Sequence, residues 1–119
     1  MITLEHNISK LNKFLKFKPN WNGYNAFAFN PLLIQKCKEL LKQFKVQPLV
    51  YPTAIGCVQL EFETDKYYLE VEVYLNHYCY YIEEGDYRHE EDNVSTTHLQ
   101  SRFHDLFKNG HIYKHYHAL

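Results

Sequence analysis

Residues 58–75 alternate between apolar and polar side chains with a period of two, and this pattern constrains the fold more than any other feature of the chain. The apolar positions are Val58, Leu60, Phe62, Leu69, Val71, Val73 and Leu75. The polar positions between them include Gln59, Glu61, Glu63, Tyr68, Glu70, Glu72 and Tyr74. Because successive side chains of a strand point to opposite faces, the pattern predicts two antiparallel strands with one buried and one wet face, joined by a turn at 64–66.

Two helices are predicted before these strands. The first covers residues 3–16, where apolar side chains spaced three or four apart share one helical face and Thr3 is placed to cap the helix. The second covers about residues 31–45 and has a longer apolar stripe at helical spacing. Asn30 is its expected cap, and Pro31 suits the first helical position because no amide hydrogen is needed there.

Beyond the hairpin, the sequence predicts a third strand at 78–82, a charged loop at 83–92 and a final helix. Ser95 or Thr96 is the expected cap of this helix, and Gly110 its expected end. Its apolar stripe is Leu99, Phe103, Leu106 and Phe107. The tail after Gly110 is expected to add an edge strand or to dock as an arm.

A chain of 119 residues with 45% hydrophobic content is typical of one globular domain. The expected fold is therefore a single α+β domain, residues 1–119. It consists of a short antiparallel β-meander of three to five strands, with two N-terminal helices and one C-terminal helix packed on one face.

Charge is distributed unevenly along the chain although the formal net charge is −1. Residues 1–48 hold eight lysines and two acidic residues, a net charge of +6. Residues 49–92 hold eleven acidic residues and two basic ones, a net charge of −9. The net charge of the chain is not positive, whereas a positive net charge is typical of nucleic-acid-binding domains. Recognition of a charged partner is therefore expected to depend on local surfaces.

Cys37, Cys57 and Cys79 are odd in number, widely spaced and without a CxxC pair, so neither a disulfide framework nor a zinc ribbon is expected. The chain does not begin with a basic segment followed by an apolar one, and no apolar run approaches the ~18 residues of a membrane span. We expect a cytoplasmic protein without a cofactor or a membrane partner. The limited core leaves pairing with a second copy open.

The middle of the chain carries short motifs in a fixed order: Asn-Trp-Asn-Gly-Tyr-Asn-Ala at 20–26, Tyr-Pro-Thr-Ala-Ile-Gly-Cys at 51–57, Leu-Glu-Phe at 60–62 and Leu-Glu-Val-Glu-Val at 69–73. It thereby resembles a group of small uncharacterised bacterial and phage-associated proteins. Their pattern is a Trp-Asp/Asn-Gly-x-x-Ala loop, a helix, a Pro-Thr-x-x-Gly-Gly segment, a Leu-Glu-Trp strand and a further Leu-x-Val/Ile-Glu strand. This chain departs at Cys57, where the pattern has Gly, and at Phe62, where it often has Trp. The resemblance implies the same order of elements and no catalytic residue.

The carboxylates on the wet face of the hairpin form the strongest candidate site. Like charges that face each other across strands destabilise the pair, so the face is either solvated and relieved by lysines or it meets a basic partner. In the second case, carboxylates steer a basic protein surface and tyrosines anchor it. The candidate partner-binding residues are Glu61, Glu63, Tyr68, Glu70, Glu72 and Tyr74. This favours a non-enzymatic interaction protein, such as an antitoxin-like or inhibitor protein of a phage or mobile element.

The lysines of the first two helices suggest an alternative, a nucleic-acid-binding protein. They are Lys10, Lys13, Lys16, Lys18, Lys36, Lys38, Lys42 and Lys45. Trp21 or Tyr24 would then stack on bases. No helix-turn-helix or RNA-recognition motif supports this, and lysines are ordinary on the polar faces of amphipathic helices. Trp21 and Tyr24 are instead expected to lock their loop onto the core.

A third alternative is a small metal-dependent enzyme that uses the C-terminal histidines. His111, His115 and His117 share a face only in an extended strand, and a zinc site needs three or four convergent ligands. An exposed polar tail is the preferred interpretation, because a chain terminus holds a preorganised site poorly. Cys57 and Cys79 lie in no nucleophile motif, and no phosphate-binding loop is present, so an enzyme is not favoured.

Overall fold

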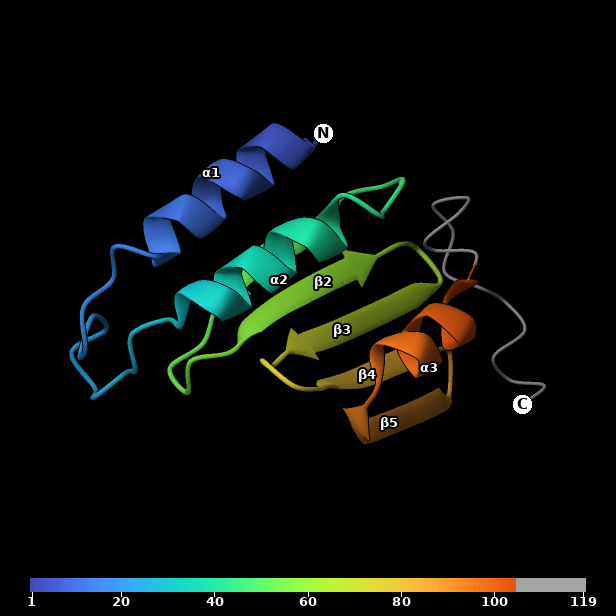
Figure 1. The fold of residues 1–119 in the computed structure, drawn as a ribbon. Helices are drawn as coiled ribbons and strands as arrows, with labels where there is room; N and C mark the ends of the chain where they lie inside the picture. Colours follow the sequence, from blue (N-terminus) through green and yellow to red (C-terminus); the bar gives the residue numbers. More distant parts are fainter. Residues whose placement is uncertain (105–119) are drawn as a thin grey trace.

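A computed structural model describes residues 1–104 as three helices and a five-stranded antiparallel sheet, which confirms the predicted α+β class. The elements are α1 (Leu4–Phe14), α2 (Pro31–Leu41), β1 (Leu49–Pro52), β2 (Val58–Glu63), β3 (Tyr67–Val73), β4 (Tyr78–Glu84), β5 (Tyr87–Val94) and α3 (Thr96–Arg102). Figure 1 shows the helices on one side of the sheet, with α2 over its middle, α3 over β4 and β5, and α1 beside α2. The arrangement is two layers, and the described part of the core lies between them.

The five strands follow one another as a meander, in the spatial order β1-β2-β3-β4-β5. The predicted hairpin is β2 and β3, with Val58 opposite Val73 and Glu61 opposite Glu70. Thr64 closes its turn by donating its backbone amide to the carbonyl of Tyr67 at 2.9 Å. This register places every second residue of both strands on the same face, as the period of two predicts.

The three helices begin where the sequence predicts, because each has a side-chain cap. Thr3 Oγ1 accepts a hydrogen bond from the His6 amide, the Asn30 side chain accepts one from Leu32, and Ser95 Oγ accepts one from His98. The ends differ from the prediction: α1 ends at residue 14 rather than 16, and α2 ends at residue 41 rather than 45.

The early end of α2 has a packing reason. A turn after Leu41 carries Phe44 into the core, where its ring meets that of Phe62 edge-on with centroids 5.1 Å apart. The Gln47 side-chain amide then donates to the carbonyl of Leu41 at 2.8 Å and satisfies one acceptor at the helix end.

The predicted apolar face of the sheet is buried against the helices with one exception. The buried members of this face are Val58, Leu60, Phe62, Leu69, Val71 and Val73, and β4 adds Tyr78, Tyr80 and Ile82. The assignment of Leu75 to this face was wrong: β3 ends at Val73, and Leu75 is exposed in the following turn. Pairing stops there because the chain must reverse direction between β3 and β4.

Residues 83–92 were predicted to be a charged loop, and this was wrong. β4 continues to Glu84, and β5 follows after a two-residue turn, Gly85-Asp86, in which Gly85 has φ +58°. Gly-Asp between two strand-like runs is a recognised hairpin signal, which the many charges of this stretch obscured.

The final helix is confirmed as α3, with Leu99 and Phe103 buried. The remainder of its predicted stripe, Leu106 and Phe107, and the predicted end at Gly110 lie outside the described residues. The predicted edge strand or docked arm of the tail lies outside them as well. Among residues 1–104, no helix combines the length and the hydrophobicity that a membrane span requires.

Candidate functional site

The face of the sheet opposite the helices carries the predicted partner-binding residues, and no helix of residues 1–104 covers it (Figure 1). Its predicted members are Glu61, Glu63, Tyr68, Glu70, Glu72 and Tyr74. The register of β2 and β3 places the first five on one side, and Tyr74 follows directly after the end of β3. The registers of β4 and β5 add Tyr81, Glu83, Arg88 and Glu90, and Asp92 lines the same small hollow as Glu72 and Glu90. We call these eleven residues the carboxylate face.

A pair of directly opposed glutamates lies at the centre of the carboxylate face. Glu61 on β2 faces Glu70 on β3, and the side-chain amide of Gln59 donates to both, at 2.6 Å and 2.9 Å. The Tyr68 hydroxyl also donates to Glu70, at 2.9 Å. Both donors are neutral groups, so they hold the two carboxyl groups in place without adding a compensating positive charge.

A second row runs across β3, β4 and β5. Tyr68 lies opposite Glu83, and Glu83 lies opposite Arg88. Glu83 accepts a hydrogen bond from the Tyr81 hydroxyl at 2.6 Å and forms an ion pair with Arg88 at 3.1 Å. The rings of Tyr68 and Tyr81 lie 6.4 Å apart, centroid to centroid. Arg88 is the one Lys or Arg in the four strands β2 to β5, so the face retains an excess of negative charge.

The crowding of charge affects the protonation of groups on this face. Burial, followed by the nearby negative charge of Glu70 and then of Asp92, raises the pKa of Glu72 above the ordinary glutamate value. Burial and the hydrogen bond to Glu70 raise the pKa of the Tyr68 hydroxyl, so Tyr68 stays a neutral donor at physiological pH. The carboxylate face is thus polar and rich in acidic groups, and Glu72 and Tyr68 are partly buried within it.

A small hollow opens between β3, β4 and β5 on the carboxylate face. Its volume is about 100 Å³, and its lining residues are Glu70, Glu72, Cys79, Tyr80, Tyr81, Glu90 and Asp92. Four acidic residues, Glu70, Glu72, Glu90 and Asp92, thus line a space of a size that suits one side-chain head group. A Lys ammonium or an Arg guanidinium from another molecule is complementary to it in charge and in hydrogen bonding.

Replacing Glu72 by Gln is expected to stabilise the protein at neutral pH. A carboxyl group whose pKa is raised by folding favours the folded state most at low pH, and this stability is lost as pH rises through the folded-state pKa. Gln removes that loss, which includes the repulsion of the Glu72 carboxylate by Glu70 and Asp92. Thermal unfolding should show a higher midpoint for Glu72→Gln at pH 7, and the difference should vanish below about pH 4, where glutamate is protonated.

Glu63→Gln is the matched control for this prediction, because Glu63 lies on the same face but is exposed at the end of β2. It should change the midpoint little. A gain for Glu72→Gln that persists at pH 3 would show that charge is not its cause.

The residues of β4 and β5 on the carboxylate face were missed at the sequence level. The missed members are Tyr81, Glu83, Arg88, Glu90 and Asp92. In β5, Arg88, Glu90 and Asp92 are exposed while Tyr87, His89 and Glu91 are half-buried, so a period of two is present in burial but not in hydrophobicity. The Gly85-Asp86 turn was the available signal.

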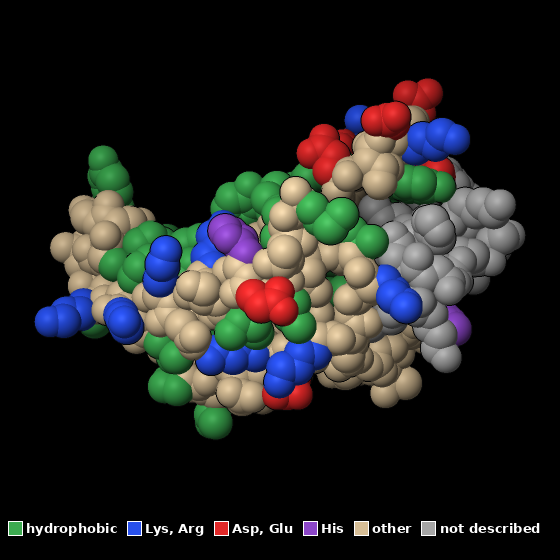
Figure 2. Space-filling view, turned by 90° about the horizontal axis from the view of Figure 1, so that it is seen from above, with side chains coloured by type: hydrophobic (Ala, Val, Ile, Leu, Met, Phe, Trp, Pro, Cys, Tyr) green, Lys and Arg blue, Asp and Glu red, His purple; other side chains and the backbone are tan. Residues whose placement is uncertain are grey.

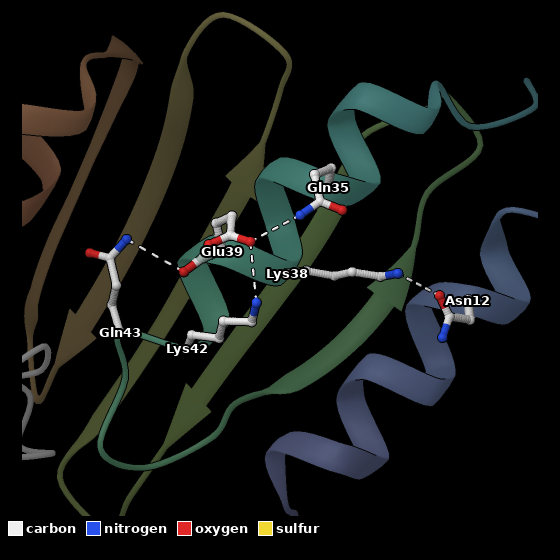
Figure 3. A network of polar contacts seen from close by, with 6 residues as sticks. All are labelled: Asn12, Gln35, Lys38, Glu39, Lys42 and Gln43. Atoms are coloured by element: carbon white, nitrogen blue, oxygen red, sulfur yellow. Dashed lines mark hydrogen bonds and ion pairs between the residues drawn. The ribbon is translucent and has the colours of Figure 1, made fainter.

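The lysines proposed for nucleic-acid binding are in several cases engaged within the protein. The Lys36 ammonium donates to the carbonyls of Tyr74 and Leu75 and lies 4.2 Å from the centre of the Tyr78 ring. Figure 3 shows Lys38 bonded to Asn12 on α1, and Lys42 paired with Glu39. A phosphate backbone would have to displace these contacts, which disfavours the alternative.

No group of three or more His, Cys, Asp or Glu within residues 1–104 is arranged to hold a metal ion. His111, His115 and His117, the proposed metal ligands, lie outside the described residues. Burial raises the pKa of the Cys57 and Cys79 thiols above the ordinary value, and that of Cys37 to about 12. These cysteines are therefore protonated at physiological pH and do not have the thiolate character of catalytic cysteines.

The fold and the site define a helix-backed antiparallel meander with an open, anionic sheet face. No family model, curated protein or solved structure matches the chain. The resemblance to small bacterial and phage-associated proteins therefore stays a prediction.

Proposed function

We propose that this protein is a non-enzymatic binding protein whose carboxylate face holds a basic surface of another protein, in the manner of an inhibitor or antitoxin-like protein. The observation that carries the proposal is the direct opposition of Glu61 and Glu70 in the middle of a sheet face. Like charges in this position cost stability. A basic partner would offset that cost when it binds.

Three features of the carboxylate face support a basic partner. The hollow at Glu72 and Asp92 matches one Lys or Arg head group. Tyr68 and Tyr81 lie next to the charged rows and offer aromatic anchor surface at low cost in side-chain entropy. The surplus of carboxylates would also accelerate encounter with a cationic surface.

The proposal is tested by titrating the protein with a fluorescent peptide rich in Lys and Arg, and with a Glu-rich peptide of equal length. We expect only the basic peptide to bind. Its affinity should fall as ionic strength rises from about 0.01 M to about 1 M, since the Debye length shortens from about 30 Å to about 3 Å. Changes in amide NMR shifts should concentrate on β2, β3 and β4.

The double variant Glu61→Lys with Glu72→Lys is expected to weaken peptide binding by more than about tenfold, or about 1.4 kcal/mol. Glu5→Lys with Glu39→Lys is the matched control, because it changes the net charge equally with residues of α1 and α2. If the two double variants lost the same amount of affinity for the basic peptide, net charge alone would explain the effect, and a specific binding site would be refuted. Purification of the partner from the native host, with the same two variants as baits, then identifies it.

A further inference from the structure

Two loops at one end of the molecule expose apolar side chains next to each other. Tyr24 is 85% exposed and Phe27 63% exposed in the loop between α1 and α2, and Ile55 is 58% exposed in the loop between β1 and β2. The backbone amide of Phe27 donates to the carbonyl of Ala54 at 2.9 Å, which joins the two loops. We call Tyr24, Phe27 and Ile55 the aromatic end.

The loop that carries the aromatic end is held in shape by polar contacts. Asn20 and Asn25 have φ values of +67° and +64°, which non-glycine residues rarely adopt. The Asn22 side chain accepts hydrogen bonds from the backbone amides of Tyr24 and Ala26, at 2.8 Å and 3.2 Å. Local strain supported by such contacts is typical of segments that are preorganised for recognition.

Trp21 completes this support. Its indole donates to the Phe27 carbonyl at 2.8 Å, and its ring packs 5.0 Å from that of Phe17. The prediction that Trp21 locks the loop onto the core is confirmed, while the same prediction for Tyr24 was wrong because Tyr24 points into solvent. The loop is held through the backbone of Tyr24 and Phe27, while both side chains are exposed to solvent and accessible to another molecule.

The surroundings of the aromatic end are basic. No Asp or Glu occurs between Glu5 and Glu39, or between Glu39 and Glu61, whereas Lys16 and Lys18 directly precede the loop. Figure 2 shows hydrophobic and lysine side chains gathered at the left end of the molecule, where Figure 1 places these loops. This surface combines apolar anchors with positive charge, which is the complement of the carboxylate face.

We infer that the partner of the carboxylate face is the aromatic end of a second copy of this chain. The inference rests on the proposed function, because it names the basic surface that the face holds. Each molecule carries both surfaces in equal number, and their charges and anchors are complementary. The Lys side chains around the loop match the carboxylates of the hollow, and Tyr24 and Phe27 match the tyrosines of the face.

The placement of the two surfaces decides the form of the assembly. The carboxylate face lies on the side of the sheet away from the helices, and the aromatic end lies in loops beyond the ends of α1 and β1 (Figure 1). The two surfaces of one molecule therefore do not meet. When identical molecules contact each other through two different surfaces, they assemble head-to-tail. Such an assembly grows into an open filament, unless the rotation that relates neighbouring molecules closes it into a ring.

The test is sedimentation of the full chain over a range of protein concentrations. At about 0.01 M ionic strength, the average mass of the wild type should rise with concentration to at least twice the monomer value. At about 1 M it should return to the monomer value, because screening removes the attraction. A wild type that stays monomeric throughout, while the basic peptide still binds, overturns this inference and leaves the proposed function standing.

Complementary variants make the test specific to the two surfaces. The end variant, Tyr24→Ser with Phe27→Ser, and the face variant, Glu61→Lys with Glu72→Lys, should each be monomeric alone. Mixed in equal amounts they should form a dimer that does not grow further, since one intact end meets one intact face. Val46→Ser, which removes an exposed apolar side chain from a different loop, should behave as the wild type.

Two outcomes would overturn the inference. The first is an end variant that self-associates as strongly as the wild type, which would exclude the aromatic end from the contact. The second is a mixture of the end and face variants that stays monomeric although both are folded by circular dichroism. If the basic peptide also fails to bind the wild type, the proposed function falls together with the inference.

Discussion

Leu60→Ala is expected to lower the free energy of unfolding by about 2–5 kcal/mol, the range for deletion of a fully buried leucine side chain. Leu60 has no exposed surface, and it lies on β2 between Val50 of β1 and Val71 of β3. The substitution removes apolar burial and leaves a cavity under the helices. Urea unfolding should give a lower midpoint with an unchanged slope.

Leu49→Ala is the matched control, because Leu49 lies one strand away and is 39% exposed on the other face of the sheet. Its effect should remain within about 0.5 kcal/mol. Similar losses for Leu60→Ala and Leu49→Ala would mean that the two faces of the sheet do not differ in burial, and the assignment of an open face would be wrong.

Asn7→Ala is expected to cost about 1–3 kcal/mol, because it leaves a buried acceptor without its donor. Asn7 is the buried polar residue of the described core, with 1% of its surface exposed. Its side-chain amide donates to the Pro48 carbonyl at 3.0 Å and to Gln47 at 3.1 Å. These bonds connect α1 to the segment that enters β1, so their loss should loosen α1 first.

Hydrogen exchange measures this local effect: amides of α1 should lose protection in Asn7→Ala more than amides of β3. Asn12→Ala is the control on the same helix, since Asn12 is exposed and accepts a hydrogen bond from Lys38 at the surface. It should change stability by less than about 0.5 kcal/mol. Uniform loss of protection across the sheet in Asn7→Ala would contradict a specific tie between α1 and β1.

The local elements were predictable because their signals are local. Thr3, Asn30 and Ser95 cap the helices through hydrogen bonds that span two or three residues, so the residue types alone indicate the starts. The position of Glu61 and Glu70 on one face follows from the period of a strand, and the pairing of neighbours follows from the short turn between them.

β5 was not predictable from hydrophobicity because its apolar environment is supplied by other elements. His89 and Glu91 lie on the helix side of the sheet, where His98 of α3 meets Glu91 at 3.1 Å and His89 meets it at 3.0 Å. Hydrogen bonds to β4 and this polar cluster compensate for the missing apolar side chains. Because part of the environment of β5 is supplied by α3, the sequence of β5 by itself does not show the alternation of apolar and polar side chains that predicts a strand.

The sequence by itself determined which residues of β2 and β3 alternate between the two faces of the sheet, where the helices begin and that negative charge gathers on one side of the hairpin. Only the tertiary structure decided that β5 extends this charged side of the sheet. It also decided that Lys36 donates hydrogen bonds to the carbonyls of Tyr74 and Leu75, and that the loops containing Phe27 and Ile55 contact each other. The physical reason is the separation along the sequence of the residues that interact. Alternation and capping act over a few residues, whereas these contacts join residues distant in the chain that become neighbours only when the layers pack.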